Sequence, residues 1–201
     1  MRLGWSHGDQ EVFTREEMIR DFDIRDVNKA AAAFNPGKLL WLNQQHMMRM
    51  SPAEIAPYFK DQLKRIGIEA PEGALVEGVI AAQRERAKTL KEMAANSRYF
   101  FMESVERDAK AFEKHLGPEQ RPTLAAVREK LAALPEWVPQ AIHAAIADLA
   151  TERGVGLGKL AQPLRVALTG STVSPPIDQT VALIGRKRAL ERIDAALRPN
   201  S

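Results

Sequence analysis

The sequence predicts an all-α protein, and three observations lead to this class. Helix start signals occur repeatedly, with a serine or threonine three residues before a glutamate. Apolar residues recur at the spacing of amphipathic helices, and alanine is abundant, with a run at 30–33. No window keeps the strict alternation of a half-buried strand. We therefore expect a helical bundle whose loops fall at proline, glycine and asparagine residues.

The first helices are predicted from their start signals. Thr14 with Glu17 forms a capping box ahead of an apolar segment. The run Ser51-Pro52-Ala53-Glu54 combines a serine N-cap, a proline at the first helical position and a glutamate at the third. A helix is predicted from there to about residue 66, ended by Gly67. Its predicted apolar face consists of Ile55, Tyr58, Phe59 and Leu63.

Later helices follow from apolar spacing and from breaks at proline and glycine. Thr89 with Glu92 offers another capping box, whereas the pattern is weak between residues 96 and 120. The remaining predicted helices cover residues 71–86, 123–134, 137–153, 159–168, 178–184 and 187–197. The tryptophans Trp5, Trp41 and Trp137 are expected to be core anchors.

The composition excludes several kinds of chemistry. The 201 residues contain no cysteine, which excludes disulfides, thiolate zinc sites and a cysteine nucleophile. The four histidines are far apart, and neither a glycine-rich phosphate loop nor a Gly-x-Ser-x-Gly elbow occurs. We therefore expect no catalytic residue and no metal site. No apolar run approaches the roughly 18 residues of a membrane helix, so we expect a cytoplasmic protein without membrane contact.

Positive charge is concentrated near the end of the chain. The formal net charge is +3, and residues 151–201 carry eight basic against four acidic side chains. Such an excess is expected of a nucleic-acid surface, because lysine and arginine neutralise phosphates. A solvated helix face would show the same excess. Charge alone leaves both interpretations open.

Two basic segments are candidates for recognition. Residues 162–176 place Arg165 on a short helix that contains a proline and then breaks into a polar turn, which would direct guanidinium donors at a base or phosphate. A second basic segment crosses a helix end at Arg84, Arg86, Lys88 and Lys91. Structural alternatives exist for both: Arg165 could pair with Asp178, and bases at a helix end are favourable to its dipole.

Three segments carry a resemblance to a known family. They are LGWSHGDQE at residues 3–11, AAAFNPGKLLWLN at 31–43 and QPLRVALTG at 162–170. In this order they closely resemble bacterial glutamyl-tRNA synthetases. The His-Ile-Gly-His and Lys-Met-Ser-Lys motifs of that family's catalytic half do not occur here. The resemblance implies the helical anticodon-binding cage of a class I aminoacyl-tRNA synthetase, which should be inactive alone.

The resemblance also implies an organisation and a partner. Residues 1–50 would complete the stem-contact region, and residues 51–107 and 108–201 would form two anticodon-binding helical subdomains. The full-length enzyme would be a glutamate–tRNA ligase that uses ATP and Mg²⁺, whereas this chain would hold no cofactor. The implied partner is tRNA(Glu), bound by a monomer, with no DNA.

Site residues follow from the family's motifs. By this resemblance, Arg86 occupies the position that reads the third anticodon base. That base is cytosine in tRNA(Glu) and guanine in tRNA(Gln). A guanidinium carries only donors, so it suits the acceptors O2 and N3 of cytosine better than the pairing edge of guanine, which also presents donors. Arg165 corresponds to a second anticodon-binding arginine, and Ser174 and Ile177 to residues that pack against anticodon bases. Contacts with the tRNA backbone are expected from Arg84, Lys88, Lys91, Arg186, Lys187 and Arg188.

Two other functions remain open from the sequence. The chain could be a helical protein-interaction module without an RNA role, its basic end serving only as a solubilising surface. It could also belong to an enzyme of relaxed specificity that charges both tRNA(Glu) and tRNA(Gln).

Overall fold

A computed structural model of the protein describes residues 4–29, 33–106 and 108–198. These residues form helices and loops without a β-strand, and one isolated bridge joins His7 to Gln10. The predicted all-α class is therefore confirmed. In chain order the helices are α1 (Arg15–Asp21), the 3-10 turn η1 (Ile24–Asp26), α2 (Pro36–Arg49), α3 (Pro52–Arg65), α4 (Ala74–Gln83), α5 (Leu90–Phe101), α6 (Ala109–Leu116), α7 (Arg121–Ala132), α8 (Pro139–Glu152), α9 (Leu157–Thr169), α10 (Ile177–Ile184) and α11 (Arg186–Leu197).

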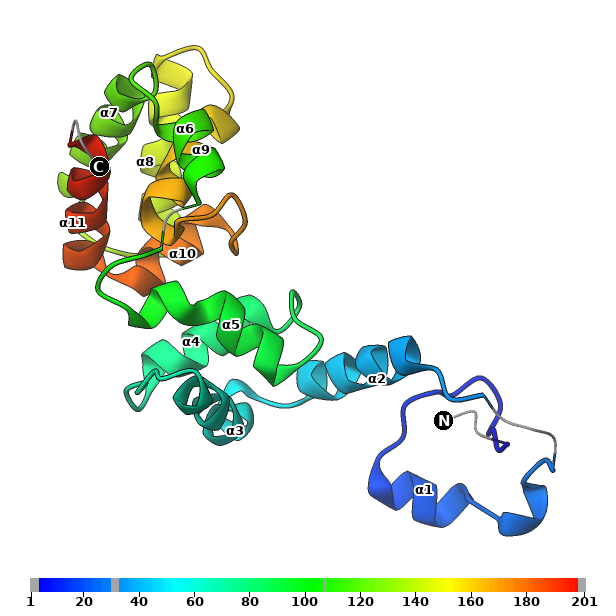
Figure 1. The fold of residues 1–201 in the computed structure, drawn as a ribbon. Helices are drawn as coiled ribbons and strands as arrows, with labels where there is room; N and C mark the ends of the chain where they lie inside the picture. The colour runs from blue at the N-terminus through cyan, green and yellow to red at the C-terminus, as the bar shows by residue number, and fades with distance from the viewer. Residues whose placement is uncertain (1–3, 30–32, 107, 199–201) are drawn as a thin grey trace.

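The helices follow one another along an elongated molecule (Figure 1). α1 and η1 lie at one end, and α2 leads from them to a first helical group, α3–α5. A second helical group, α6–α11, occupies the other end. α3 packs on both α4 and α5, while α7, α9 and α11 pack on one another and α8 packs on α7 and α9. α10 contacts α4 as well as α8, and it therefore joins the two groups.

Local capping chemistry sets several helix starts. The capping boxes predicted at Thr14 and Ser51 are both formed, with each hydroxyl accepting from the amide three residues later and each glutamate accepting from the N-cap amide. At Thr89 the hydroxyl accepts from the Glu92 amide at 3.1 Å, but the Glu92 carboxylate accepts from the amide of Lys88 instead. The third box therefore forms only in part.

One hydrophobic core runs through both helical groups. Phe59 of α3, Phe100 of α5 and Leu164 of α9 are all fully buried, and each contributes about 1.5–3 kcal/mol through its removal from water. The predicted apolar face of α3 is wrong at Tyr58, which is 62% exposed. The buried residues of α3 recur every four positions, so Tyr58, one position before Phe59, points away from that stripe.

The apolar pattern gives no bounds for two of the helices. α2 buries only Met47 along its 14 residues, so it lacks the stripe that a sequence pattern detects. α6 falls inside the stretch 96–120, where the pattern is weak. α4 begins at Ala74 rather than near residue 71, because Gly73 adopts a φ of 90° at its N-cap.

Candidate nucleic-acid interface

Arg86 lies on the loop between α4 and α5, residues 84–89. The loop starts where α4 ends at Gln83, whose buried side chain donates to the carbonyl of Asn96 on α5 at 3.1 Å. Ala87 in the middle of the loop is fully buried. The backbone is thus held against the first helical group, while the Arg86 side chain remains exposed.

α2 braces the same loop from another direction. Asn43 donates to the carbonyl of Lys88 at 2.6 Å, and Gln44 donates to the carbonyl of Glu85 at 2.9 Å. These bonds satisfy carbonyls that a tight loop would otherwise leave to water. The position of Arg86 therefore depends on α2 as well as on α4 and α5.

Arg165 lies on α9, near the point where this helix ends. The hydroxyl of Thr169, the last residue of α9, donates to the carbonyl of Arg165 at 2.9 Å. Gly170 then adopts a φ of 73°, a left-handed conformation that glycine takes without steric cost. The chain turns there into the loop of residues 171–176, which leads to α10.

The two arginines come from different helical groups and meet at Ser174. Nη2 of Arg86 donates to the carbonyl of Ser174 at 2.8 Å. Nε of Arg165 donates to the hydroxyl of the same serine at 2.9 Å, and its Nη1 donates to Oε1 of Gln162. Arg86 and Arg165, predicted separately from sequence, are therefore brought together on one side of the molecule.

Hydrogen bonds to its own loop and to α10 hold Ser174 in place. The residue is buried, and its hydroxyl donates to the carbonyl of Pro175 at 2.7 Å. Thr180 of α10, also buried, has its hydroxyl 3.3 Å from that of Ser174. The loop therefore offers both arginines a rigid acceptor and does not need to rearrange to hold them.

Both guanidinium groups bond to Ser174, and the described residues place no acidic partner on either of them. Burial, and next the positive charge of Arg86, lower the pKa of Arg165 below its ordinary value. In the described part of the chain neither arginine forms an ion pair, so the alternative pairing of Arg165 with Asp178 is not observed. Two neighbouring cations with unused donors form a site suited to acceptor-rich ligands.

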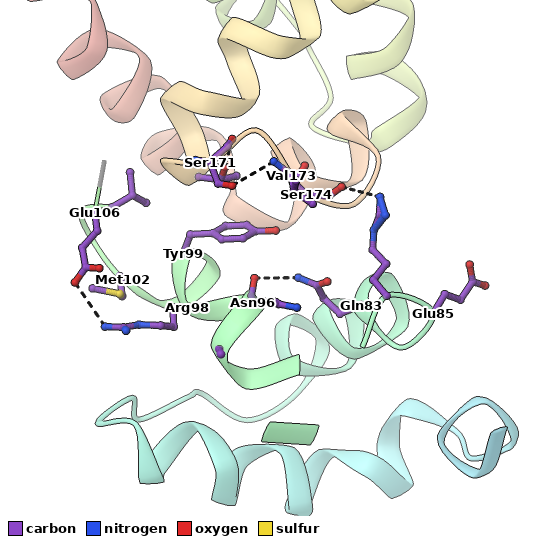
Figure 2. Close-up of a pocket in the computed structure, with 14 residues that line it drawn as sticks. Gln83, Glu85, Asn96, Arg98, Tyr99, Met102, Glu106, Ser171, Val173 and Ser174 are labelled. Carbon is purple, nitrogen blue, oxygen red and sulfur yellow. Dashed lines mark hydrogen bonds and ion pairs between the residues drawn. The ribbon is translucent and has the colours of Figure 1, made fainter. Parts of the chain in front are cut away.

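A pocket of about 600 Å³, lined by Arg86 and Ser174 but not by Arg165, opens between α5 and the loop 171–176 (Figure 2). Figure 2 shows Tyr99 reaching from α5 beneath the loop that carries Ser171, Val173 and Ser174. The Tyr99 hydroxyl is buried without a hydrogen-bond partner among the described residues. Burial raises the pKa of this phenol, while the charges of Arg86, Arg165 and Arg192 act in the opposite direction.

The other two predicted anticodon contacts lie below the surface. Ile177 is the first residue of α10 and is 5% exposed, so its side chain belongs to the core of the second helical group. Ser174 contacts the two arginines through its carbonyl and hydroxyl groups. Contact of either residue with a base stays a prediction.

The predicted backbone-contact residues divide into two kinds. Lys88, Lys91 and Lys187 are exposed, and Lys187 lies 4.0 Å from Glu191, whereas the three arginines donate to backbone carbonyls. Arg84 donates to the carbonyl of Met50 at 3.2 Å. Arg186 donates to the carbonyl of Leu134 and lies 5.3 Å over the ring of Trp137, while Arg188 donates to the carbonyl of Phe100 at 2.7 Å. These bonds provide a structural reason for basic residues at the start of α11.

Metal-binding clusters and membrane-spanning helices are both absent from the described residues. No group of three histidine, aspartate or glutamate side chains there is arranged to hold a metal ion. Among the same residues, every helix is too short or too polar to cross a membrane.

Sequence reasoning missed four residues that shape the site: Asn43, Gln44, Tyr99 and Gln162. Gln162 was detectable in principle, because it precedes Arg165 by three positions on one helix and such pairs lie on the same face. The other three act on partners that lie elsewhere in the fold. No local pattern distinguishes them from ordinary surface or core residues.

Comparison with known proteins gives consistent matches. The family model described as "Anticodon binding domain" matches residues 50–197. Glutamate–tRNA ligase 1 of Alkalilimnicola ehrlichii is 51% identical over 197 residues, and glutamate–tRNA ligase 2 of Coxiella burnetii is 54% identical over 198 residues. Each alignment covers 98% of this chain but only 42% of the relative.

Solved structures agree with these relatives. A glutamate tRNA ligase from Elizabethkingia meningosepticum, crystallised with its amino acid, superposes with a TM-score of 0.89 at 31% identity, covering all of this chain and 40% of that one. The glutamate-tRNA synthetase of Elizabethkingia anophelis gives a TM-score of 0.82 at 32% identity, over 98% of this chain and 38% of that one. The chain thus resembles a part of these enzymes nearly end to end, and it belongs to the anticodon binding domain family.

Proposed function

We propose that this chain is the tRNA-recognition part of a glutamate–tRNA ligase, and that Arg86 and Arg165 engage anticodon bases of tRNA(Glu). The observation that carries the proposal is the meeting of these two arginines at Ser174 beside an open pocket. Unpaired RNA bases are recognised by hydrogen bonds to their edges and by stacking on guanidinium planes and aromatic rings. The site supplies guanidinium groups from two directions.

The ligation chemistry is assigned to another part of the enzyme. The chain spans 42% of the curated ligases that it matches. We propose that the remaining part holds ATP, Mg²⁺ and glutamate, and that this chain contributes no catalytic residue and no cofactor site. The complete ligase is expected to work as a cytoplasmic monomer, as the family resemblance implies.

Exposed apolar side chains near one end also fit a chain that works with a further part. Ile19, Ile24 and Phe34 are 72%, 73% and 64% exposed. Other large apolar residues exposed in this region are Met18, Phe22, Leu39, Leu40 and Trp41. Trp41 is thus not the core anchor that the sequence predicts. Apolar patches on soluble monomers usually mark an interaction site, and here the remainder of the ligase is the proposed occupant.

A binding titration tests the proposal. The chain is titrated with labelled tRNA(Glu) and with the same RNA carrying guanine in place of cytosine at the third anticodon position. We expect tighter binding to the cytosine form by roughly tenfold, within the range of one well-formed side-chain contact to a base. No binding to either RNA at low salt would favour the protein-interaction module. Equal binding to both would favour the enzyme of relaxed specificity.

Lys88 and Lys91 provide a separate prediction about the RNA backbone. Changing both to glutamine should weaken binding to the cytosine and guanine forms alike. It should also lower the slope of log affinity against log salt by about one for each phosphate that is no longer neutralised. Lys64 on α3, equally exposed but distant in sequence from the loop, is the matched control. An unchanged slope in the double variant would contradict the assignment of these lysines.

A further inference from the structure

The candidate site lies between two helical groups, so its geometry depends on what holds them together. α4 packs on α10 across this junction, and Arg86 of the first group donates to Ser174 of the second. Further polar links across the junction come from α11, where Arg188 and Arg192 donate to carbonyls at the end of α5. Arg192 bonds to both sides of the junction, and it is therefore the residue most able to fix the two groups together.

Arg192 connects three backbone carbonyls from two helices and a loop. Its Nη1 donates to the carbonyl of Leu168 on α9 at 2.6 Å, while its Nη2 donates to Tyr99 of α5 at 2.8 Å and to Met102 just beyond it. The last carbonyls of α5 have no partner within the helix and lie at the negative end of its dipole. A guanidinium at this position therefore satisfies orphan acceptors and compensates the dipole.

The setting of Arg192 is costly for a charged group. Only 5% of the residue is exposed, its Nε is buried without a partner among the described residues, and backbone carbonyls rather than a carboxylate accept its hydrogen bonds. Burial, and then the charge of Arg188, lower the pKa of Arg192 to about 10, so it remains protonated at neutral pH. A methionine would fill such a position at lower cost, which suggests that the bonds serve to fix geometry.

The carbonyls that Arg192 holds are close in the chain to both sides of the site. Leu168 follows Arg165 by three positions on α9, so the two lie within one helical turn. Tyr99 contributes its carbonyl to Arg192 and its side chain to the pocket. The guanidinium thus ties the wall of the pocket on α5 directly to the helix that carries Arg165.

We propose that Arg192 is a positioning residue for the candidate RNA site: it clamps the end of α5 to α9 and so fixes the separation of Arg86 from Arg165. Because Arg192 is 5% exposed and does not line the pocket between α5 and the loop 171–176, it acts without touching the RNA. The inference rests on the proposed function only for its effect on RNA recognition, since the clamp itself is a property of the fold.

The clamp is tested first without RNA. The chain contains no cysteine, so spin labels can be placed on cysteines introduced at Lys64 of α3 and Glu113 of α6, which are both exposed. Pulsed electron paramagnetic resonance then reports the distribution of distances between the two spin labels, and so between the two helical groups. We expect a narrow distribution for the parent and a broader or shifted one for Arg192→Gln. Arg192→Lys should give the same change, because an ammonium cannot reproduce the fork of donors.

The matched control is Arg128→Gln. Arg128 on α7 forms an ion pair with Asp194 on α11 at 2.9 Å, within the second helical group. Its loss removes an arginine bond to α11 without touching the junction, so the distribution should stay narrow. A distribution in folded Arg192→Gln and Arg192→Lys that matches the parent would overturn the clamp. If Arg192→Gln fails to fold, Arg192→Lys alone decides.

RNA binding then tests the consequence. Arg192→Gln should reduce the preference for cytosine over guanine at the third anticodon position about fivefold, whereas Arg128→Gln should preserve it. A broadened distribution together with an unchanged preference would overturn the positioning role. If the parent itself shows no preference, the proposed function fails, and the distance measurement still decides whether Arg192 holds the junction.

Discussion

Replacing Arg86 with glutamine is expected to reduce the preference for cytosine over guanine at the third anticodon base by about tenfold, which leaves the two RNAs nearly equal in affinity. Arginine carries only donors, which match the acceptors of cytosine and meet donors on the pairing edge of guanine. Glutamine carries one donor group and one acceptor, so it can bond to either base. The variant should therefore gain affinity for the guanine form relative to the cytosine form.

The structure supports this expectation through the bonds of Arg86. One nitrogen, Nη2, donates to the carbonyl of Ser174, and within the described residues Nε and Nη1 make no hydrogen bond. The side chain is exposed, and its loop is braced by Asn43 and Gln44. A guanidinium held at one corner, with free donors beside a pocket, can bond to a base without losing its anchor.

Competition binding with the two RNAs measures the effect. Arg98→Gln is the matched control, since Arg98 is an exposed arginine that lines the same pocket and lies 3.9 Å from Glu106. The control should leave the preference unchanged. If Arg86→Gln and the parent prefer cytosine equally, Arg86 does not read this base.

Much of the fold could be predicted because its determinants are local. The capping boxes at Thr14 and Ser51 involve residues three positions apart, so the sequence contains both partners in one short segment. The buried residues of α3 repeat at helical spacing for the same reason. By contrast, α2 has hardly any apolar stripe. Its bonds from Asn43 and Gln44 to the loop that carries Arg86 involve partners more than 40 positions away.

In the candidate site, too, the residues could be predicted from local motifs, but their contacts with distant parts of the chain could not. Family motifs placed Arg86 and Arg165 in sequence, but no motif indicates that both would donate to Ser174. That meeting depends on α4 packing against α10 and on the bonds of Arg192. Tyr99 was missed for a related reason: an aromatic residue at the end of a helix has the same local pattern whether it fills a core or lines a pocket. Tertiary packing, rather than local propensity, determines both the meeting of the two arginines at Ser174 and the place of Tyr99 in the pocket.

Changing Arg165 to methionine is expected to weaken RNA binding while leaving the free energy of unfolding almost unchanged. RNA affinity should fall by roughly 5-fold to 100-fold, the range for loss of one good side-chain bond to a base. The free energy of unfolding should change by less than about 1 kcal/mol, because methionine keeps much of the aliphatic packing.

The small stability effect follows from what the arginine leaves behind. The Ser174 hydroxyl retains its bond to the carbonyl of Pro175, and Gln162 is only half-buried, so water can replace the missing donor. Removal of the charge also relieves the repulsion by Arg86 that contributes to the lowered pKa of Arg165. The structural cost is therefore offset in part.

Two measurements on the same Arg165→Met sample show whether Arg165 contributes to RNA binding or only to stability. Fluorescence anisotropy with the anticodon stem-loop reports affinity, and urea unfolding reports stability. Arg153 provides the matched control, because it is an exposed arginine of the second helical group, 3.4 Å from the Thr123 hydroxyl. Arg153→Met should retain full affinity. A large loss of stability with unchanged affinity in Arg165→Met would mean that Arg165 serves only to hold the loop 171–176. Arg86 would then be the one guanidinium of the pair still available to a base.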